Sequence, residues 1–290
     1  MKIAVVPSSN KEIDKYTSPL VSAIIFGLKD FSVNYPELGL EEIKNFSLKN
    51  KDIDIFVSIN KTIFNEDLES VEKYLIELDK LSIKGVLFYD LGILNIYKRH
   101  KFKYSLVWHQ THMVTNYNTC NYYYNEGVQY GVIAGEITKD EIIEIKNKTK
   151  MKLFVTLIAR PIMAHSRRKL LSNYYKSIDK NYDGEIKTIK EGLHDYLIKE
   201  DKNGTCILED KIVNGLTYIN EFNDNKIEYG IINGMELGDK LLLELIPLVN
   251  EVLNNNDKKS LEKIIKLIGN NTLFFDKKTV FKVKKDEKKN

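Results

Sequence analysis

Eight short β-rich apolar runs constrain this chain more than any other feature of its sequence. Each is followed by a longer charged stretch that is compatible with a helix. The runs are Lys2–Val6, Val21–Phe26, Ile53–Ile59, Gly85–Tyr89, Tyr104–Trp108, Gln129–Ala134, Lys152–Ile158 and Ile227–Ile232. Strands that alternate with helices predict parallel βα units. Eight units in 290 residues predict an α/β fold, a closed (β/α)8 TIM-type barrel of the usual size of about 250 residues. An open doubly wound sheet is the alternative.

The segment between the seventh and eighth runs is too long for a single helix. It extends from residue 158 to residue 226, a separation of 68 positions. A helix around Arg168–Tyr175 is expected there, followed by a hairpin of Tyr196–Lys199 and Thr205–Leu208 turned by Asn203-Gly204. We therefore expect one barrel domain over residues 1–275, with an insertion on its rim over about 160–225.

The last fifteen residues, 276–290, form a basic tail. They contain seven lysines and three acidic residues, a net charge of +4, whereas the whole chain carries +3. The body of the protein is therefore close to neutral. A basic tail can neutralise nucleic-acid phosphates, but it is also a common ending for a soluble chain, and the sequence leaves both readings open.

The composition excludes several classes of protein. Apolar residues make up 43% and charged residues 29%, which is ordinary for a globular chain and unlike a disordered one. No apolar run approaches the ~20 residues that span a bilayer, and the apolar start is too short for a signal peptide. We expect a cytoplasmic protein with no membrane partner. Two cysteines, Cys120 and Cys206, are too few for a disulfide scaffold or a cysteine-only metal site.

Candidate catalytic residues follow from the expected barrel, because function gathers at the carboxyl ends of its strands. Asp90, His109 and Glu136 directly follow three of the runs and could move a proton. Asn60 and Gln110 stand in similar positions and could bind substrate. The alternatives are helix capping for the carboxylates and bonds to loop carbonyls for the histidine. His109, His112 and Glu136 could together hold a metal, but no metal-binding signature is present, so no metal is expected.

Arginine is rare in this chain and its distribution is uneven. Three of the four arginines, Arg160, Arg167 and Arg168, lie within nine residues, whereas the chain has 40 lysines. The planar guanidinium binds phosphate or carboxylate through a fork that lysine lacks. We expect Arg160 to point toward the barrel mouth, and Arg168 to be the one of the adjacent pair on the inserted helix that faces it. Salt bridges within the insertion are the alternative.

The stretch Ser166-Arg167-Arg168-Lys169-Leu170-Leu171-Ser172-Asn173-Tyr174 resembles the signature of the collagenase-like peptidases, peptidase family U32. More narrowly, it resembles a Firmicute-type branch of that family. Other pieces agree in the same order: Val57–Asn60, Asp90–Leu94, Thr115-Asn116, Glu136-Ile137, Gly204-Thr205 and Phe274–Val280. The resemblance implies a (β/α)8 barrel and adds Asn116 and Asn173 to the candidate substrate-binding residues. It also favours Arg168 over Arg167, because the motif keeps arginine at that position.

The family's known members imply three functions that the sequence leaves open. The family name implies proteolysis. Several relatives take part in hydroxylation of a wobble uridine in tRNA, which makes tRNA a candidate partner. Others hydroxylate ubiquinone with an iron–sulfur cluster, but the cysteines that hold that cluster are absent here, so no cluster is expected.

Departures from the family pattern keep a non-catalytic role open as well. Gly135 stands where the family has arginine, and Ile158-Ala159 stands where it has His-Gly. We expect an enzyme or subunit of tRNA wobble-uridine hydroxylation. The alternatives are a collagenase-like peptidase, or a degenerate paralogue that binds RNA or an active U32 partner.

Overall fold

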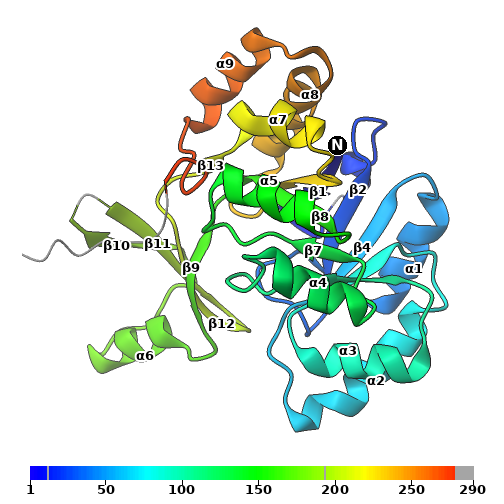
Figure 1. Ribbon diagram of the computed structural model, residues 1–290. Coiled ribbons are helices and arrows are strands. Elements are labelled where there is room, and N and C mark those ends of the chain that lie inside the picture. Colours follow the sequence, from blue (N-terminus) through cyan, green and yellow to red (C-terminus); the bar gives the residue numbers. More distant parts are fainter. Residues whose placement is uncertain (12, 193, 278–290) are drawn as a thin grey trace, which may run out of the picture.

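A closed eight-stranded parallel barrel forms the centre of the computed structural model, which describes residues 1–11, 13–192 and 194–277 (Figure 1). Its strands are β1 (Lys2–Val6), β2 (Ala23–Leu28), β4 (Asp54–Ile59), β5 (Gly85–Phe88), β6 (Ser105–Trp108), β7 (Tyr130–Val132), β8 (Lys152–Ala159) and β14 (Tyr229–Asn233). Around the barrel they follow the order β1-β14-β8-β7-β6-β5-β4-β2. β1 pairs with β2, through Ala4 with Ala23, and with β14, so the ring is closed and the open sheet is excluded.

Helices surround the barrel and cover the outer face of its strands. They are α1 (Leu40–Lys49), α2 (Leu68–Leu78), α3 (Leu91–His100), α4 (Tyr117–Asn125), α5 (Lys139–Lys148), α7 (Ile219–Asp224), α8 (Asp239–Asn255) and α9 (Lys258–Ile268). Short 3-10 turns occupy Ile13–Tyr16, Asn65–Asp67 and Leu216–Tyr218, and the two-residue strand β3 (Glu37–Leu38) pairs with β2. α2 shows why these segments are helical: Val71, Leu75 and Leu78 recur on one face and are fully buried. No helix in the described ranges is long and apolar enough to cross a membrane.

The expected insertion is present after β8 as a separate antiparallel sheet. Its strands β9 (Ile162–Ser166), β10 (Lys187–Glu191), β11 (His194–Asp201) and β12 (Gly204–Leu208) pair in the order β10-β11-β12-β9. The expected hairpin is β11–β12, and the expected helix is α6 (Leu170–Ser177). β9 and β10 were not expected, because Ile162–Ser166 and Lys187–Glu191 are largely exposed and lack a buried apolar pattern. The chain returns to the barrel through β13 (Val213–Asn214), which pairs with β8.

The basic tail lies almost wholly outside the described residues, which end at Lys277. A role of this tail in binding nucleic-acid phosphates therefore stays a prediction.

Aromatic rings fill the interior of the barrel. Phe56 is fully buried and lies edge-on to Tyr130, Phe154 and Tyr229, with ring centroids 5.2 to 6.1 Å away. At the amino-terminal end of the barrel the Tyr229 hydroxyl donates to Asp54 Oδ2 at 2.6 Å. Burial raises the pKa of Asp54, but the bonds from Tyr229 and Lys2 outweigh it and hold that pKa below its usual value. Packed aromatic rings and the bonded Asp54 carboxylate therefore close this end of the barrel.

Replacing Tyr229 with phenylalanine tests the bond to Asp54. The Tyr229→Phe variant loses the hydroxyl that holds the Asp54 carboxylate, and we expect the free energy of unfolding at pH 7 to fall by about 1–2 kcal/mol. Tyr130→Phe is the matched control, since Tyr130 is also buried in the barrel but its hydroxyl bonds to none of the described residues. Urea unfolding of both variants measures the difference. Equal stability of the two would show that the bond to Asp54 contributes nothing.

Candidate functional site at the barrel mouth

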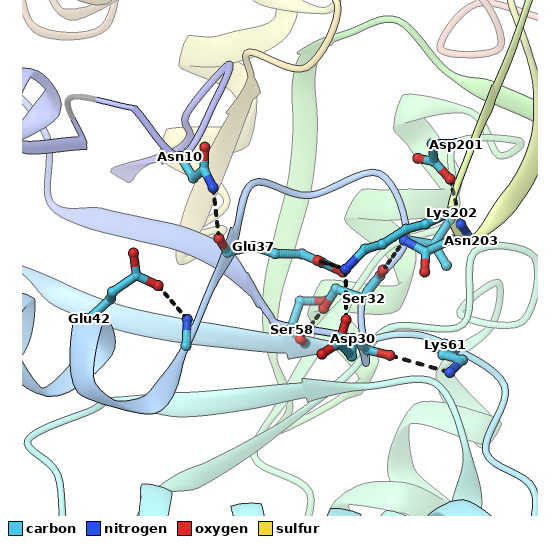
Figure 2. A network of polar contacts seen from close by, with 12 residues as sticks. Asn10, Asp30, Ser32, Glu37, Glu42, Ser58, Lys61, Asp201, Lys202 and Asn203 are labelled. Atoms are coloured by element: carbon cyan, nitrogen blue, oxygen red, sulfur yellow. Dashed lines mark hydrogen bonds and ion pairs between the residues drawn. The ribbon is translucent and has the colours of Figure 1, made fainter. Parts of the chain in front are cut away.

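The insertion crosses the carboxyl-terminal mouth of the barrel. It leaves from β8, but its β11–β12 turn reaches the loop that follows β2, across the ring (Figure 2). Lys202 Nζ lies 2.7 Å from both Asp30 Oδ1 and Glu37 Oε2, and Asn203 Nδ2 donates to the Ser32 carbonyl at 3.1 Å. These contacts fix the tip of the hairpin to the rim.

Two further residues of the insertion, Lys199 and Arg167, hold it over the mouth. On β11, Lys199 Nζ donates to Asn34 Oδ1 at 2.9 Å and pairs with Glu236, which follows β14. The Arg167 guanidinium stacks on Phe64, which follows β4, 4.2 Å from the ring centroid. The insertion therefore contacts the loops after β2, β4 and β14. The loops after β5, β6 and β7 form the other side of the mouth.

A histidine that is neutral at pH 7 follows β6 at the barrel mouth. His109 follows β6, and its Nδ1 is 3.5 Å from the Tyr35 hydroxyl, with the two rings edge-to-face. Burial lowers the pKa of His109 to about 4 and raises that of Tyr35. At neutral pH both groups are uncharged, so together they can accept or donate hydrogen bonds to a neutral ligand. A ring with so low a pKa is a weak general base, and the catalytic role of His109 stays a prediction.

The predicted residue Glu136 lies on the open side of the mouth. Its Oε1 is 2.9 Å from His112 Nδ1, and both side chains are at least half exposed. The structure thus brings together two residues that the sequence placed after neighbouring strands. The carboxylate is accessible to a ligand that enters from solvent.

Four other predicted site residues bond to the protein itself. Asp90 accepts from Gly92 N at 2.8 Å and Asn116 accepts from Thr119 N at 2.9 Å, so both cap helices. Asn60 bonds the backbone of Val33 through both side-chain atoms. Gln110 accepts from Trp108 Nε1 at 3.1 Å and donates to the Tyr89 carbonyl at 2.6 Å. These bonds shape the mouth loops, and any contact with substrate stays a prediction.

The arginines are placed differently from the expectation. Arg160 Nη1 donates to the carbonyls of Glu209 and Asp210, at 2.8 and 2.5 Å, so its guanidinium ties the start of the insertion to its end. Arg167 and Arg168 precede α6, which begins at Leu170, so neither lies on the inserted helix as expected. Arg168 and the predicted residue Asn173 are both exposed on the insertion. Their binding roles stay predictions.

The comparisons with known proteins identify the family. The family model described as peptidase family U32 matches residues 10–275. The chain belongs to peptidase family U32.

Two curated relatives of this U32 protein come from Bacillus subtilis (strain 168). It is 27% identical over 271 residues to "tRNA hydroxylation protein P2", a match that covers 87% of this chain and 85% of the relative. It is 24% identical over 155 residues to "tRNA hydroxylation protein P1", covering 53% of this chain and 36% of that protein. A solved U32 peptidase is similar over 55% of this chain and 70% of its own, with 15% identity and a TM-score of 0.45.

The thiols of this U32 protein are poor candidates for chemistry. Cys206 on β12 and Cys120 on α4 are both buried, and burial raises their pKa to about 11 and about 12. Both are protonated at neutral pH, so neither is an activated nucleophile. They lie on separate elements, and two thiols cannot supply the four ligands of a cysteine-held iron–sulfur cluster. The residues present therefore do not fit that cofactor.

One cluster of possible metal ligands was missed from the sequence. His194, Glu209 and Asp210 bring ligand atoms within 4.8 Å of one another. They were missed because His194 starts β11 while the two acids follow β12, so only the hairpin register brings them together. Arg160 bonds the backbone of both acidic residues, so a positive charge already lies beside them.

Lys199, Glu236 and Tyr35 were also missed at the mouth. Lys199 and Asn34 are 165 positions apart. No local pattern marks such a contact, and the charge pair became visible only once the insertion had been placed over the rim.

Proposed function

We propose that this U32 protein takes part in hydroxylation of a wobble uridine in tRNA, in the cytoplasm, as an enzyme or as a subunit that works with a paralogous U32 protein. The observation that carries the proposal is the match to tRNA hydroxylation protein P2, which covers 87% of this chain and 85% of that relative. A match of this extent includes the barrel, the mouth loops and the insertion.

The chemistry of the mouth supports a nucleobase ligand. Enzymes that modify a base read it by hydrogen bonds and stacking, after the base has left its stack. Uracil is neutral, and His109 and Tyr35 offer neutral hydrogen-bonding groups at the mouth. Glu136 on the open side could hold a ribose hydroxyl or accept a proton.

Proteolysis is the second candidate, because the family carries the name of a peptidase. It would require an activated nucleophile, a bound metal or a pair of carboxylates. The two buried thiols do not meet the first requirement. We rank it below tRNA hydroxylation because the match that covers 87% of this chain is to a protein named for tRNA hydroxylation.

Deletion of the gene tests the proposal. Mass spectrometry of nucleosides from purified tRNA is expected to show loss of the hydroxylated wobble uridine, and the wild-type gene should restore it. A gene carrying His109→Ala should restore less than a tenth of the modification, because the ligand loses its partner in the mouth. His100→Ala is the matched control, since His100 pairs with Glu72 on the outer helices and should restore it fully.

Two results would contradict the proposal. Unchanged wobble uridines in the deletion strain would remove the tRNA role. Cleavage of a peptide library by the purified protein, together with unchanged uridines, would instead establish the peptidase.

A further inference from the structure

A group of cations without acidic partners surrounds α6. Arg167, Arg168, Lys169, Lys176 and Lys180 occur within 14 residues that contain one acid, Asp179. None of these five side chains pairs with a carboxylate among the described residues. Other lysines of the insertion are paired, Lys187 with Asp183, Lys199 with Glu236 and Lys202 with Asp30. Positive charge is therefore left unbalanced on this part of the insertion.

The helix presents these charges outward because its other face is anchored. Leu171 is buried against the insertion sheet, with 8% of its surface exposed. Glu200 Oε2 on β11 accepts from the backbone N–H groups of Leu171 and Ser172 at 2.8 and 3.1 Å. The helix N-terminus is thus already satisfied by a carboxylate, and any anion at this surface must be held by the side-chain cations.

An exposed aromatic ring lies among the cations. Tyr174 is 59% exposed, in the middle of the eight-residue helix. Asn173 and Lys176 are three residues apart on α6, so they share one side of the helix, and Lys169 directly precedes it. Exposed aromatics interleaved with lysine and arginine are typical of surfaces that bind single-stranded nucleic acid, where bases stack and cations neutralise phosphates.

The surface is continuous with the barrel rim. Arg167 lies just before α6 and stacks on Phe64, which follows β4. We propose that the α6 basic face, made by Arg167, Arg168, Lys169, Lys176, Lys180 and Tyr174, binds the phosphate backbone of tRNA with an unpaired base stacked on Tyr174. This inference rests on the proposed function and assigns a location to the tRNA contact.

Charge removal on this face is the test. The triple variant Arg168→Gln/Lys169→Gln/Lys176→Gln is compared with Lys258→Gln/Lys259→Gln/Lys266→Gln on α9, which loses the same charge. In Figure 1, α9 lies at the top and α6 at the lower left. Binding of an unmodified tRNA transcript is measured by fluorescence anisotropy over a salt series. For the α6 variant we expect affinity to fall on the order of tenfold to a hundredfold, and the log–log salt slope to decrease in magnitude by about 2.

Tyr174→Ala separates stacking from charge. Its tRNA affinity should fall on the order of tenfold with the salt slope unchanged, and Tyr174→Trp should restore it. Equal loss in the α9 control would overturn the proposal, as would an α6 variant with unchanged slope. An α6 variant that loses binding to polyglutamate but not to tRNA would make the face a protein-docking surface instead.

The outcomes distinguish this inference from the proposed function. If deletion of the gene abolishes the modification while the α6 variant binds tRNA normally, the function stands and the surface is wrong. If the α6 variant loses tRNA binding while the deletion strain keeps its hydroxylated uridines, the surface stands and the proposed reaction is wrong.

Discussion

The Gly204→Ala variant is expected to disorder the edge of the insertion while the barrel stays folded. Gly204 begins β12 with φ of +123°, in the region that favours glycine. A Cβ there would lie 2.1 Å from the Ser166 carbonyl oxygen and 2.7 Å from Arg167 Cα. Both are backbone atoms, so neither can move without separating β9 from β12. Backbone strain and overlap together should cost about 3–5 kcal/mol.

Gly184→Ala is the matched control. Gly184 also belongs to the insertion and has a positive φ of +81°, but an added Cβ would meet no atom within 4 Å. The Gly184→Ala variant should lose only about 1 kcal/mol of stability, from the strain of a side chain at positive φ. Hydrogen exchange of the β9 and β12 amides is expected to accelerate about a hundredfold or more in Gly204→Ala relative to Gly184→Ala. Equal exchange in the two variants would show that the close approach of β9 to β12 is not what requires glycine.

The stability of the protein should fall in acid because His109 cannot take up a proton in the folded state. Its pKa is about 4 when folded, against about 6.5 in an unfolded chain. As the pH falls below 6.5, the His109 imidazole binds a proton in the unfolded chain but not in the folded protein. Proton binding therefore stabilises the unfolded state. The penalty is complete once the pH has fallen to about 4, and it amounts to about 3 kcal/mol.

Unfolding in urea between pH 7 and pH 4 measures this effect. The His109→Gln variant lacks the penalty, so it should gain about 3 kcal/mol relative to wild type as the pH falls. Nuclear magnetic resonance of the His109 ring over a pH series should give the midpoint of its titration directly. Tyr35→Ala admits water and should raise that midpoint toward 6.5, whereas Tyr35→Phe keeps the ring covered and should leave it low. A midpoint above 6 in the wild-type protein would contradict the prediction.

Local patterns were sufficient to predict the barrel. Each of the eight predicted apolar runs overlaps a barrel strand, because a strand buried on both faces is an uninterrupted apolar segment. The capping box of Thr138 and Glu141 at the start of α5 is equally local, because it joins residues three positions apart. The hairpin turn at Asn203-Gly204 was also readable, since glycine there satisfies a backbone requirement within a few residues.

The candidate site was only partly predictable, because sequence position indicates which end of the barrel a residue occupies but not what it bonds. Asp90, Asn60 and Asn116 reach the mouth loops as expected, yet their side chains bond neighbouring backbone. His109 was placed correctly, but its low pKa depends on burial, which a linear pattern cannot give.

The sequence by itself determined the barrel strands, most of the helices around them and the presence of an inserted segment, because these depend on hydrophobic periodicity and turn residues a few positions apart. The tertiary structure alone decided that the insertion crosses the mouth. That arrangement depends on contacts such as Lys199 with Glu236 and Lys202 with Asp30, which join residues 37 and 172 positions apart. It also decided which cations are neutralised and which, on α6, remain unpaired, because pairing depends on distances that form only after the chain has folded.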